Sequence, residues 1–198
     1  MTAATYTHEH LVRDLTARIL DRLASQDPRA PGALDALGLA NETRLMVQVG
    51  LVLVGNQAEP ASIGRESLAL IGEKLERPVK ENPSASAISS GDMVLLSVGL
   101  EDALSGGKAL VARLEKQLQA LGRSGAIGVV ALDQFNAWPQ AQRQKIAAVV
   151  QKHPCPRVFC FFGSDPSYPS APRLSLLDGC QELDVGTETP SCRRRMGM

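Results

Sequence analysis

The chain has 198 residues, which is enough for one domain with a well-buried core and too short for two comfortable ones. A hydrophobic content of 44% excludes wholesale disorder, and an aromatic content of only 4% argues against a platform that stacks single-stranded bases. The net charge is zero but uneven: residues 1–104 carry 9 Lys and Arg against 14 Asp and Glu, and residues 105–157 carry 8 against 2. The basic stretch indicates a polyanionic or acidic partner, or two halves of the protein that face each other.

The sequence has no feature typical of export or of a membrane span. Residues 1–10 are polar, and the longest apolar-rich stretch, Leu45 to Val54, is well short of the roughly 20 residues that a span needs. We therefore expect a cytoplasmic protein that does not enter a membrane. The cysteines lack the paired spacing of a zinc site, and we expect idle or buried thiols at Cys155, Cys160, Cys180 and Cys192.

The first part of the chain predicts a helical layer over residues 7–77. An apolar stripe with a spacing of four residues, capped by Thr7, indicates the first helix: Leu11, Leu15, Ile19 and Leu23. A short helix is expected over residues 33–39, and another over residues 62–77, ended by Pro78. The apolar run of residues 42–54 fits a buried helix or a buried strand, and the capping residue Asn41 favours the helix.

From Asp92 onward the pattern changes to alternating strands and helices. Strands are predicted over residues 93–100, 126–133 and 157–163, with helices over residues 108–121 and from Pro139 onward. This βαβαβ order predicts an α/β fold with a small, mainly parallel sheet, covered by helices. We expect one domain over residues 1–163, with its sheet core in residues 92–163, and an irregular segment over residues 164–198.

Gly106, Gly107 and Lys108 are predicted to form a turn between a strand and a helix, where backbone amides could bind a phosphate or nucleotide. The P-loop signature G-x-x-x-x-G-K-[ST] does not fit, because Asp102 stands at its first glycine and Ala109 at its hydroxyl position. Asp133 ends a strand like the acid that accompanies a P-loop, but it follows too soon. A plain tight turn is the alternative.

Two further motifs have ordinary explanations. Ser105 and Lys108 match the S-x-x-K pattern of a lysine-activated serine, but the companion motifs S-D-N and K-T-G are absent from the sequence. A group of potential metal ligands lies at the start of the first helix: His8, Glu9, His10 and Asp14. Solvated or capping roles are the expected ones for these side chains. No metal site is predicted from the residues themselves.

The order of elements over residues 62–163 resembles the restriction-endonuclease-like, or PD-(D/E)xK, fold family. The resemblance is carried by three segments: the Asp-led strand of residues 91–96, the helix around residues 113–117 and the strand of residues 125–133. In that family a helix Glu, a strand Asp and a later acid-x-Lys bind a divalent metal and activate water for phosphodiester cleavage.

The resemblance implies metal ligands only where this sequence matches. Asp92 would be the strand Asp, Glu66 or Glu73 the helix Glu, and Glu101 the remaining acid, with Mg²⁺ bound only if the centre is intact. The acid-x-Lys expected near residues 97–99 is absent, and Glu101 and Lys108 are too far apart in sequence to replace it. We therefore expect a related core that does not cleave DNA.

The basic side of the predicted helix over residues 108–121 is the surface most typical of a binding function. Arg113 and Lys116, with Arg123 just beyond, lie opposite the apolar stripe of this helix. Such a surface predicts contact with the phosphates of DNA or RNA. Docking of an acidic protein partner on the same surface is the competing hypothesis, and phosphate binding at Gly106–Lys108 is a third.

Overall fold

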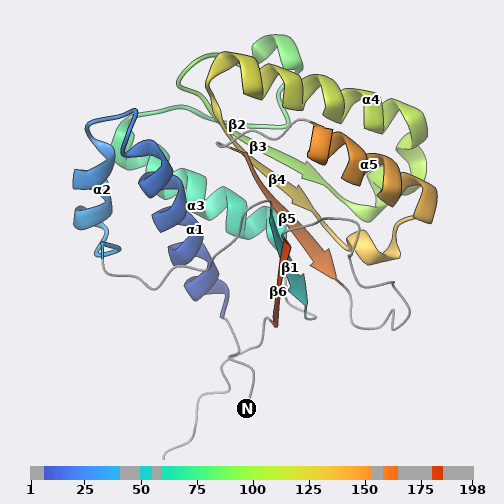
Figure 1. Cartoon of the computed structure of the whole chain (residues 1–198), viewed down its shortest axis with the longest axis horizontal. Helices are drawn as coiled ribbons and strands as arrows, with labels where there is room; N and C mark the ends of the chain where they lie inside the picture. The colour runs from blue at the N-terminus through green and yellow to red at the C-terminus, as the bar shows by residue number, and fades with distance from the viewer. Residues whose placement is uncertain (1–6, 41–49, 55–58, 153–157, 165–179, 185–198) are drawn as a thin grey trace, which may run out of the picture.

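The computed structural model describes residues 7–40, 50–54, 59–152, 158–164 and 180–184. These residues form a three-layer α/β/α arrangement around a six-stranded parallel sheet with the strand order β2-β3-β4-β5-β1-β6 (Figure 1). In that order the strands are β2 (Val79–Glu81), β3 (Met93–Val98), β4 (Ile127–Leu132), β5 (Val158–Ser164), β1 (Gly50–Val54) and β6 (Cys180–Asp184). The predicted α/β class with a small parallel sheet is confirmed.

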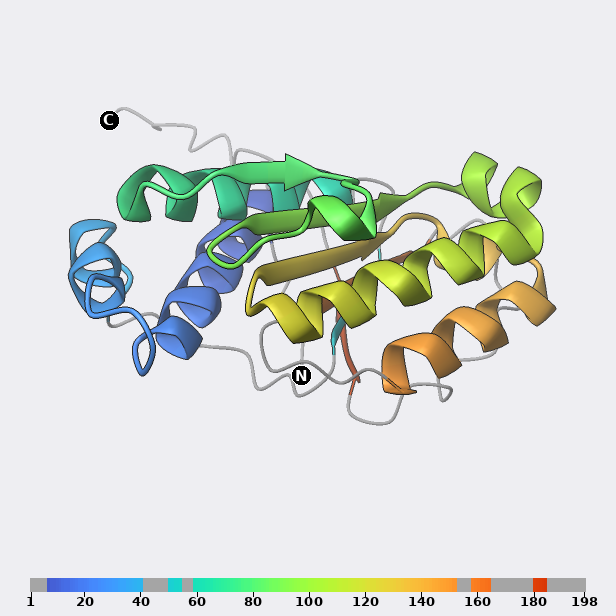
Figure 2. The same cartoon turned by 90° about the horizontal axis from the view of Figure 1, so that it is seen from above.

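Helices cover both faces of the sheet. One face carries α3 (Pro60–Leu75), against which pack α1 (His8–Leu23) and α2 (Ala30–Ala36). The other face carries α4 (Leu100–Ser124) and α5 (Gln140–Lys152). Figure 2 shows α3 on one side of the strands and α4 and α5 on the other. Two single-turn 3₁₀ helices complete the described elements, η1 (Ala85–Ala87) and η2 (Phe135–Ala137).

Alternate residues of the central strands supply two separate cores. Met93 and Leu95 of β3 pack with α1, α2 and α3, whereas Val94 and Leu96 pack with α4 and α5. Strand β4 is buried along its whole length and divides its side chains in the same way. The two-sided burial explains why these strands have continuous apolar sequences, as parallel strands between helices require. The expected packing of Leu114 and Ile146 against the sheet is confirmed.

The first helix forms as its sequence predicts. The Thr7 hydroxyl accepts a hydrogen bond from the His10 backbone N–H at 3.2 Å, which satisfies one of the free amides of the first turn. The predicted stripe from Leu11 to Leu23 is buried in the first core. The predicted helix over residues 62–77 is confirmed as α3.

The prediction of a helix over residues 42–54 is wrong for the part that the structure describes. Residues 50–54 form strand β1, which pairs in parallel with β5 on one side and β6 on the other. Residues 41–49 lie outside the described residues. A short apolar run has no periodicity that separates a helix from a strand buried on both sides, and the cap signal of Asn41 was misleading.

The glycine pair does not separate a strand from a helix. Helix α4 begins at Leu100, directly after β3, and continues through Gly106 to Ser124. Gly107 has φ 47° and ψ −128°, which are not helical values, so α4 consists of two helical segments that meet at a kink at Gly107. The predicted helix over residues 108–121 is therefore the second part of a longer one, and the turn after β3 is at Gly99.

Two segments predicted to be irregular contain regular structure. Residues 180–184, within the segment expected to be irregular, form the edge strand β6. The connection over residues 80–91 contains most of β2 and all of η1. Neither strand shows a long apolar run, because each lies at an edge of the sheet. No helix among the described residues is long and apolar enough to cross a membrane.

A matched pair of glycines in α4 and β4 tests how tightly this helix packs on the sheet. A Cβ at Gly128 would lie 2.6 Å from Cδ1 of the buried Leu121, whereas a Cβ at Gly122 would meet nothing within 4 Å. We expect Gly128→Ala to destabilise the fold by about 1–3 kcal/mol through overpacking. Gly122→Ala should stabilise it by about 0.5–1 kcal/mol through helix propensity. Urea unfolding measures both, and equal effects would contradict the packing described here.

Candidate functional site

Asp92 is a buried structural carboxylate at the amino end of β3. Its Oδ2 accepts hydrogen bonds from Lys80 Nζ and from the Ser89 backbone N–H, both at 2.7 Å. Burial by itself raises the pKa of Asp92, but these two hydrogen bonds and the Lys80 charge together hold the pKa below its usual value. Lys80 also donates to the Ala87 carbonyl at 2.8 Å. Asp92 thus fixes the connection between β2 and β3.

The other carboxylates considered for a nuclease centre lie elsewhere. Glu101 is exposed in the first turn of α4, beyond the carboxyl end of β3, whereas Asp92 precedes the amino end. A six-residue strand separates them by about 20 Å. Glu73 is exposed near the end of α3, and Glu66 pairs with His8 at 2.9 Å. The structure does not bring these four side chains together.

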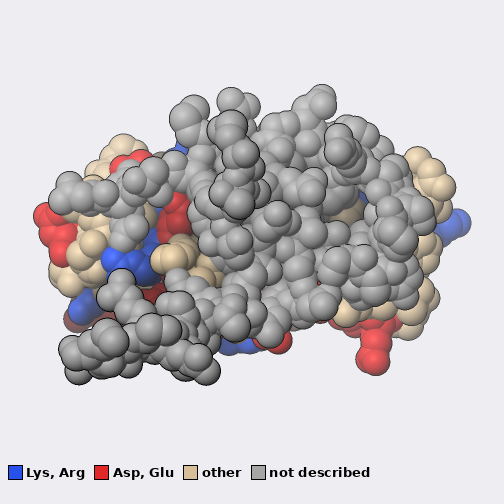
Figure 3. Space-filling model, turned by 90° about the horizontal axis from the view of Figure 1, so that it is seen from below, with Lys and Arg blue, Asp and Glu red and all other residues tan. Residues whose placement is uncertain are grey.

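Within the described ranges, no three His, Cys, Asp or Glu side chains are grouped as metal ligands. Two of the four side chains at the start of α1 form contacts within the fold. His8 donates to Glu66 of α3, and Asp14 pairs with Arg18 at 2.8 Å. In the view of Figure 3, basic and acidic side chains are interspersed at the α1–α2 end of the molecule. The side chains of Cys155, Cys160, Cys180 and Cys192 lie outside the described part of the structure.

The Gly106–Lys108 segment lies at the kink inside α4 and not at a turn between a strand and a helix. Lys108 is exposed. Ser105, the serine of the S-x-x-K match, donates to the Glu101 carbonyl at 2.8 Å, one helical turn earlier. Its hydroxyl is thus used by the helix itself.

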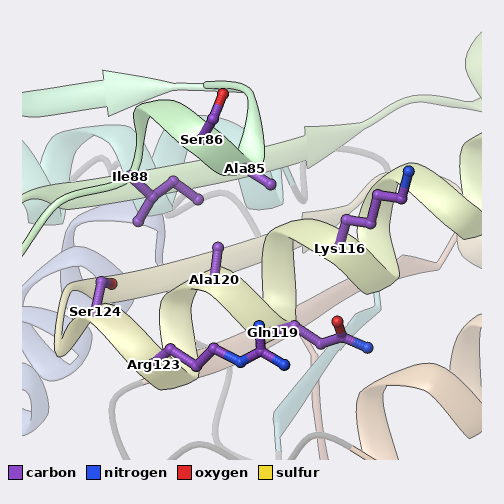
Figure 4. A pocket seen from close by; sticks show the side chains of 8 residues that line it. All are labelled: Ala85, Ser86, Ile88, Lys116, Gln119, Ala120, Arg123 and Ser124. Carbon is purple, nitrogen blue, oxygen red and sulfur yellow. The ribbon is translucent and has the colours of Figure 1, made fainter.

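The basic side chains predicted on α4 are exposed, and two of the three line one hollow. Lys116 and Arg123 border a hollow of about 480 Å³ between α4 and η1 (Figure 4). Arg113 is not among the residues that line it. The lining is completed by Ala85, Ser86, Ile88, Gln119, Ala120 and Ser124. It contains no carboxylate and no aromatic ring. Neither Lys116 nor Arg123 forms an ion pair with any residue that the structure describes.

The wall of this hollow opposite α4 is formed by residues 85–88. Three contacts hold it in place. Gln117 of α4 donates to the Pro83 carbonyl at 2.7 Å. Ile88 is buried in the core beneath α4. Lys80 and Asp92 fix the other end of the segment, through Ala87 and Ser89. The sequence predicted the cations but not this wall, because residues 80–91 have no periodic pattern.

A second candidate site lies at the carboxyl edge of the sheet. The chain leaves β1 toward α3 on one face and leaves β4 toward α5 on the other. Strand β5 lies between β4 and β1, and open α/β sheets bind ligands outside the carboxyl ends of their strands. Asp133, which follows β4 directly, lies at this edge. Burial raises its pKa, the negative charge of Glu59 raises it further, and the Gln134 backbone N–H only partly opposes them.

In a strand–loop–helix unit, a P-loop would occupy the connection from β1 to α3. The sequence did not indicate this position, because residues 50–54 were expected to be helical. Residues 55–62 read GNQAEPAS, which matches the signature at Gly55 and Ser62. It departs from the signature at the second glycine and at the lysine, which are Pro60 and Ala61 here. The junction therefore lacks the cation and one backbone donor of a P-loop. Residues 55–58 lie outside the described residues.

No family model matches the chain, and no curated protein matches its sequence. The fold is similar to that of solved structures, among them C. elegans PCH-2, with a TM-score of 0.55 and 12% sequence identity. That match covers 91% of this chain and 43% of the PCH-2 chain, so this chain spans less than half the length of PCH-2. At this identity the similarity describes the fold alone.

The role of Asp92 can be tested by removing its charge. We expect Asp92→Asn to destabilise the protein by about 1–3 kcal/mol at neutral pH, because Lys80 and Ser89 lose a charged acceptor. The folded pKa lies below the ordinary 3.8, so the contribution of the carboxylate is fully present above that pH and is lost as the pH falls through the folded value. The stability difference between wild type and variant should therefore begin to shrink only below pH 3.8 and should vanish below the folded pKa.

The matched control is Asp35→Asn on α2, whose side chain is exposed. This substitution should change the free energy of unfolding by less than about 0.5 kcal/mol at any pH. Urea titrations over a pH series measure both variants. A stability of Asp92→Asn equal to that of the control would show that Asp92 does not hold the β2–β3 connection.

Proposed function

We propose that this domain binds the phosphate backbone of nucleic acid through the basic hollow between α4 and η1. The observation that carries the proposal is the pair of cations, Lys116 and Arg123, which line one hollow without a carboxylate among its other residues. Unpaired cations on a fixed surface are available to displace counterions from a polyanion. Arg113 extends the same basic surface along α4.

The spacing and chemistry of the hollow favour phosphates over bases. Lys116 and Arg123 are seven residues apart, about 10 Å along the helix axis, so they can contact different phosphates of one backbone. The polar side chains of Gln119 and Ser86 can donate hydrogen bonds to phosphate oxygens. The lining has no ring on which a base could stack. We therefore propose binding with little sequence preference.

Chemistry at the other candidate sites is less well supported. Pro60 and Ala61 remove a donor and the cation that a P-loop offers to phosphates, and Glu59 and Asp133 add negative charge near by. A restriction-endonuclease-like core stays a prediction from sequence, and in such a core the absent acid-x-Lys leaves no complete metal centre. The proposal is therefore one of binding without cleavage.

Docking of an acidic protein segment on the same hollow is the second candidate function. The same two cations favour it, because carboxylates and phosphates accept the same hydrogen bonds from Lys and Arg. Salt dependence of binding to nucleic acid distinguishes the two. A nucleic acid releases condensed counterions, so its binding constant falls steeply with salt.

The proposal predicts the behaviour of the double substitution Lys116→Glu with Arg123→Glu. We expect binding to a labelled DNA or RNA duplex to weaken by at least about tenfold, and the slope of log K against log salt to flatten by about two. Both side chains are exposed, so stability should change by less than about 0.5 kcal/mol. Fluorescence anisotropy at several salt concentrations measures the binding.

The control carries the same change of charge away from the hollow, Lys74→Glu on α3 with Lys145→Glu on α5, both exposed. It should retain most of the binding and of the salt slope. An equal loss in both variants would mean that net charge, and not the hollow, is responsible. Absence of salt-sensitive binding by the wild type to DNA and RNA would exclude the nucleic-acid function and favour the acidic protein partner.

A further inference from the structure

Arg143 is a buried cation at a position where an apolar side chain would be expected. It is the first member of the stripe of α5 that faces the core, followed by Ile146, Ala147 and Val150. Only 8% of Arg143 is exposed. Its backbone N–H donates to the Pro139 carbonyl at 3.0 Å, which places Arg143 at the start of α5.

No described group neutralises this charge. Arg143 Nε is buried without a hydrogen-bond partner, and the neighbouring Gln142 Oε1 is in the same condition. No described carboxylate pairs with Arg143. Asp133 is the nearest acid in sequence, but its pKa is raised, whereas a paired guanidinium would lower it.

The position of Arg143 agrees with the general location of ligand sites in this class of sheet. Strands β4 and β5 are parallel, so α5 runs back between them and its first turn lies beside the carboxyl end of β4. Helix η2, which precedes α5, contacts β5. Ligands of open α/β sheets bind outside the carboxyl ends of the strands. Arg143 is thus a buried cation near the edge at which ligands of such sheets bind.

We propose that Arg143 binds a small oxyanion at the carboxyl edge of the sheet. A buried unpaired charge is costly, and a bound oxyanion would compensate it with two parallel N–H···O bonds from the guanidinium. The chemistry of the ligand is that of a phosphate group, free or as part of a larger metabolite. This site is separate from the basic hollow of α4, and its existence does not depend on the proposed function.

Inorganic phosphate is the probe, and sodium chloride at matched ionic strength is the reference. We expect phosphate to raise the melting temperature of the wild type saturably and above the chloride reference, because a ligand that binds the folded state stabilises it. Arg143→Met keeps the length of the side chain without the charge. It should melt no lower than the wild type in chloride and should lose the phosphate response.

A second variant keeps the test decisive if Arg143→Met does not fold. Arg143→Lys retains the charge but not the planar fork, so the phosphate concentration at half-response should rise several-fold. The control variant Lys74→Glu, at an exposed position of α3 away from both candidate sites, should keep the full response. The proposal is overturned if wild type shows no response beyond chloride, if either Arg143 variant responds like wild type, or if Lys74→Glu loses the response as well.

Discussion

Strands β3 and β4 lie between two helical layers, and almost every side chain on them is buried, half toward α3 and half toward α4 and α5. This two-sided burial leaves no solvated face on the centre of the sheet. Polar chemistry is therefore confined to three places: the two edges where strands begin and end, and the outer surfaces of the helices. The candidate sites follow this division, with Asp133 and Arg143 at the carboxyl edge and the basic hollow on the outside of α4.

Some charged residues have hydrogen-bond partners within the fold, whereas others have none among the described residues. Asp27 accepts from Arg29 and Arg77 and so connects the loop after α1 to the end of α3, and its pKa is lowered, chiefly by the Arg29 backbone N–H. Asp92 has a similar role between β2 and β3. Lys116, Arg123 and Arg143 have no such described partners. A buried or fixed charge without a described partner contributes little to the stability of the fold. Such a charge is therefore a better candidate for ligand binding than a paired one.

The sequence was sufficient for most of the sheet and insufficient for the sites. β3, β4, β5 and the helices between them were predictable, because continuous apolar runs and a stripe with helical spacing identify a covered parallel sheet. β1 was not, because five apolar residues have no distinguishing period, and β6 is short and polar. The glycine pair was expected between a strand and a helix, whereas Gly107 lies at a kink between two helical segments.

The candidate sites needed the three-dimensional arrangement. Lys116 and Arg123 could be placed on the polar side of a helix from spacing alone, but the wall formed by residues 85–88 came from contacts that no local pattern encodes. Arg143 had no visible signal, since an arginine in an apolar stripe is indistinguishable in sequence from one at its border. Its importance depends on burial, which only the packed fold reveals.

The position of β1 in the sheet also affects how the chain folds. Gly50 pairs with Cys160 on one side and with Cys180 on the other, 110 and 130 residues later in the chain. Strand β1 can therefore pair with its neighbours only after β5 and β6, which come much later in the sequence, are available. Such distant pairings carry a large loop-closure cost and slow the final step of folding. During synthesis on the ribosome, β2 to β4 can pair while β1 still lacks partners, and the sheet is complete only after β6 has emerged.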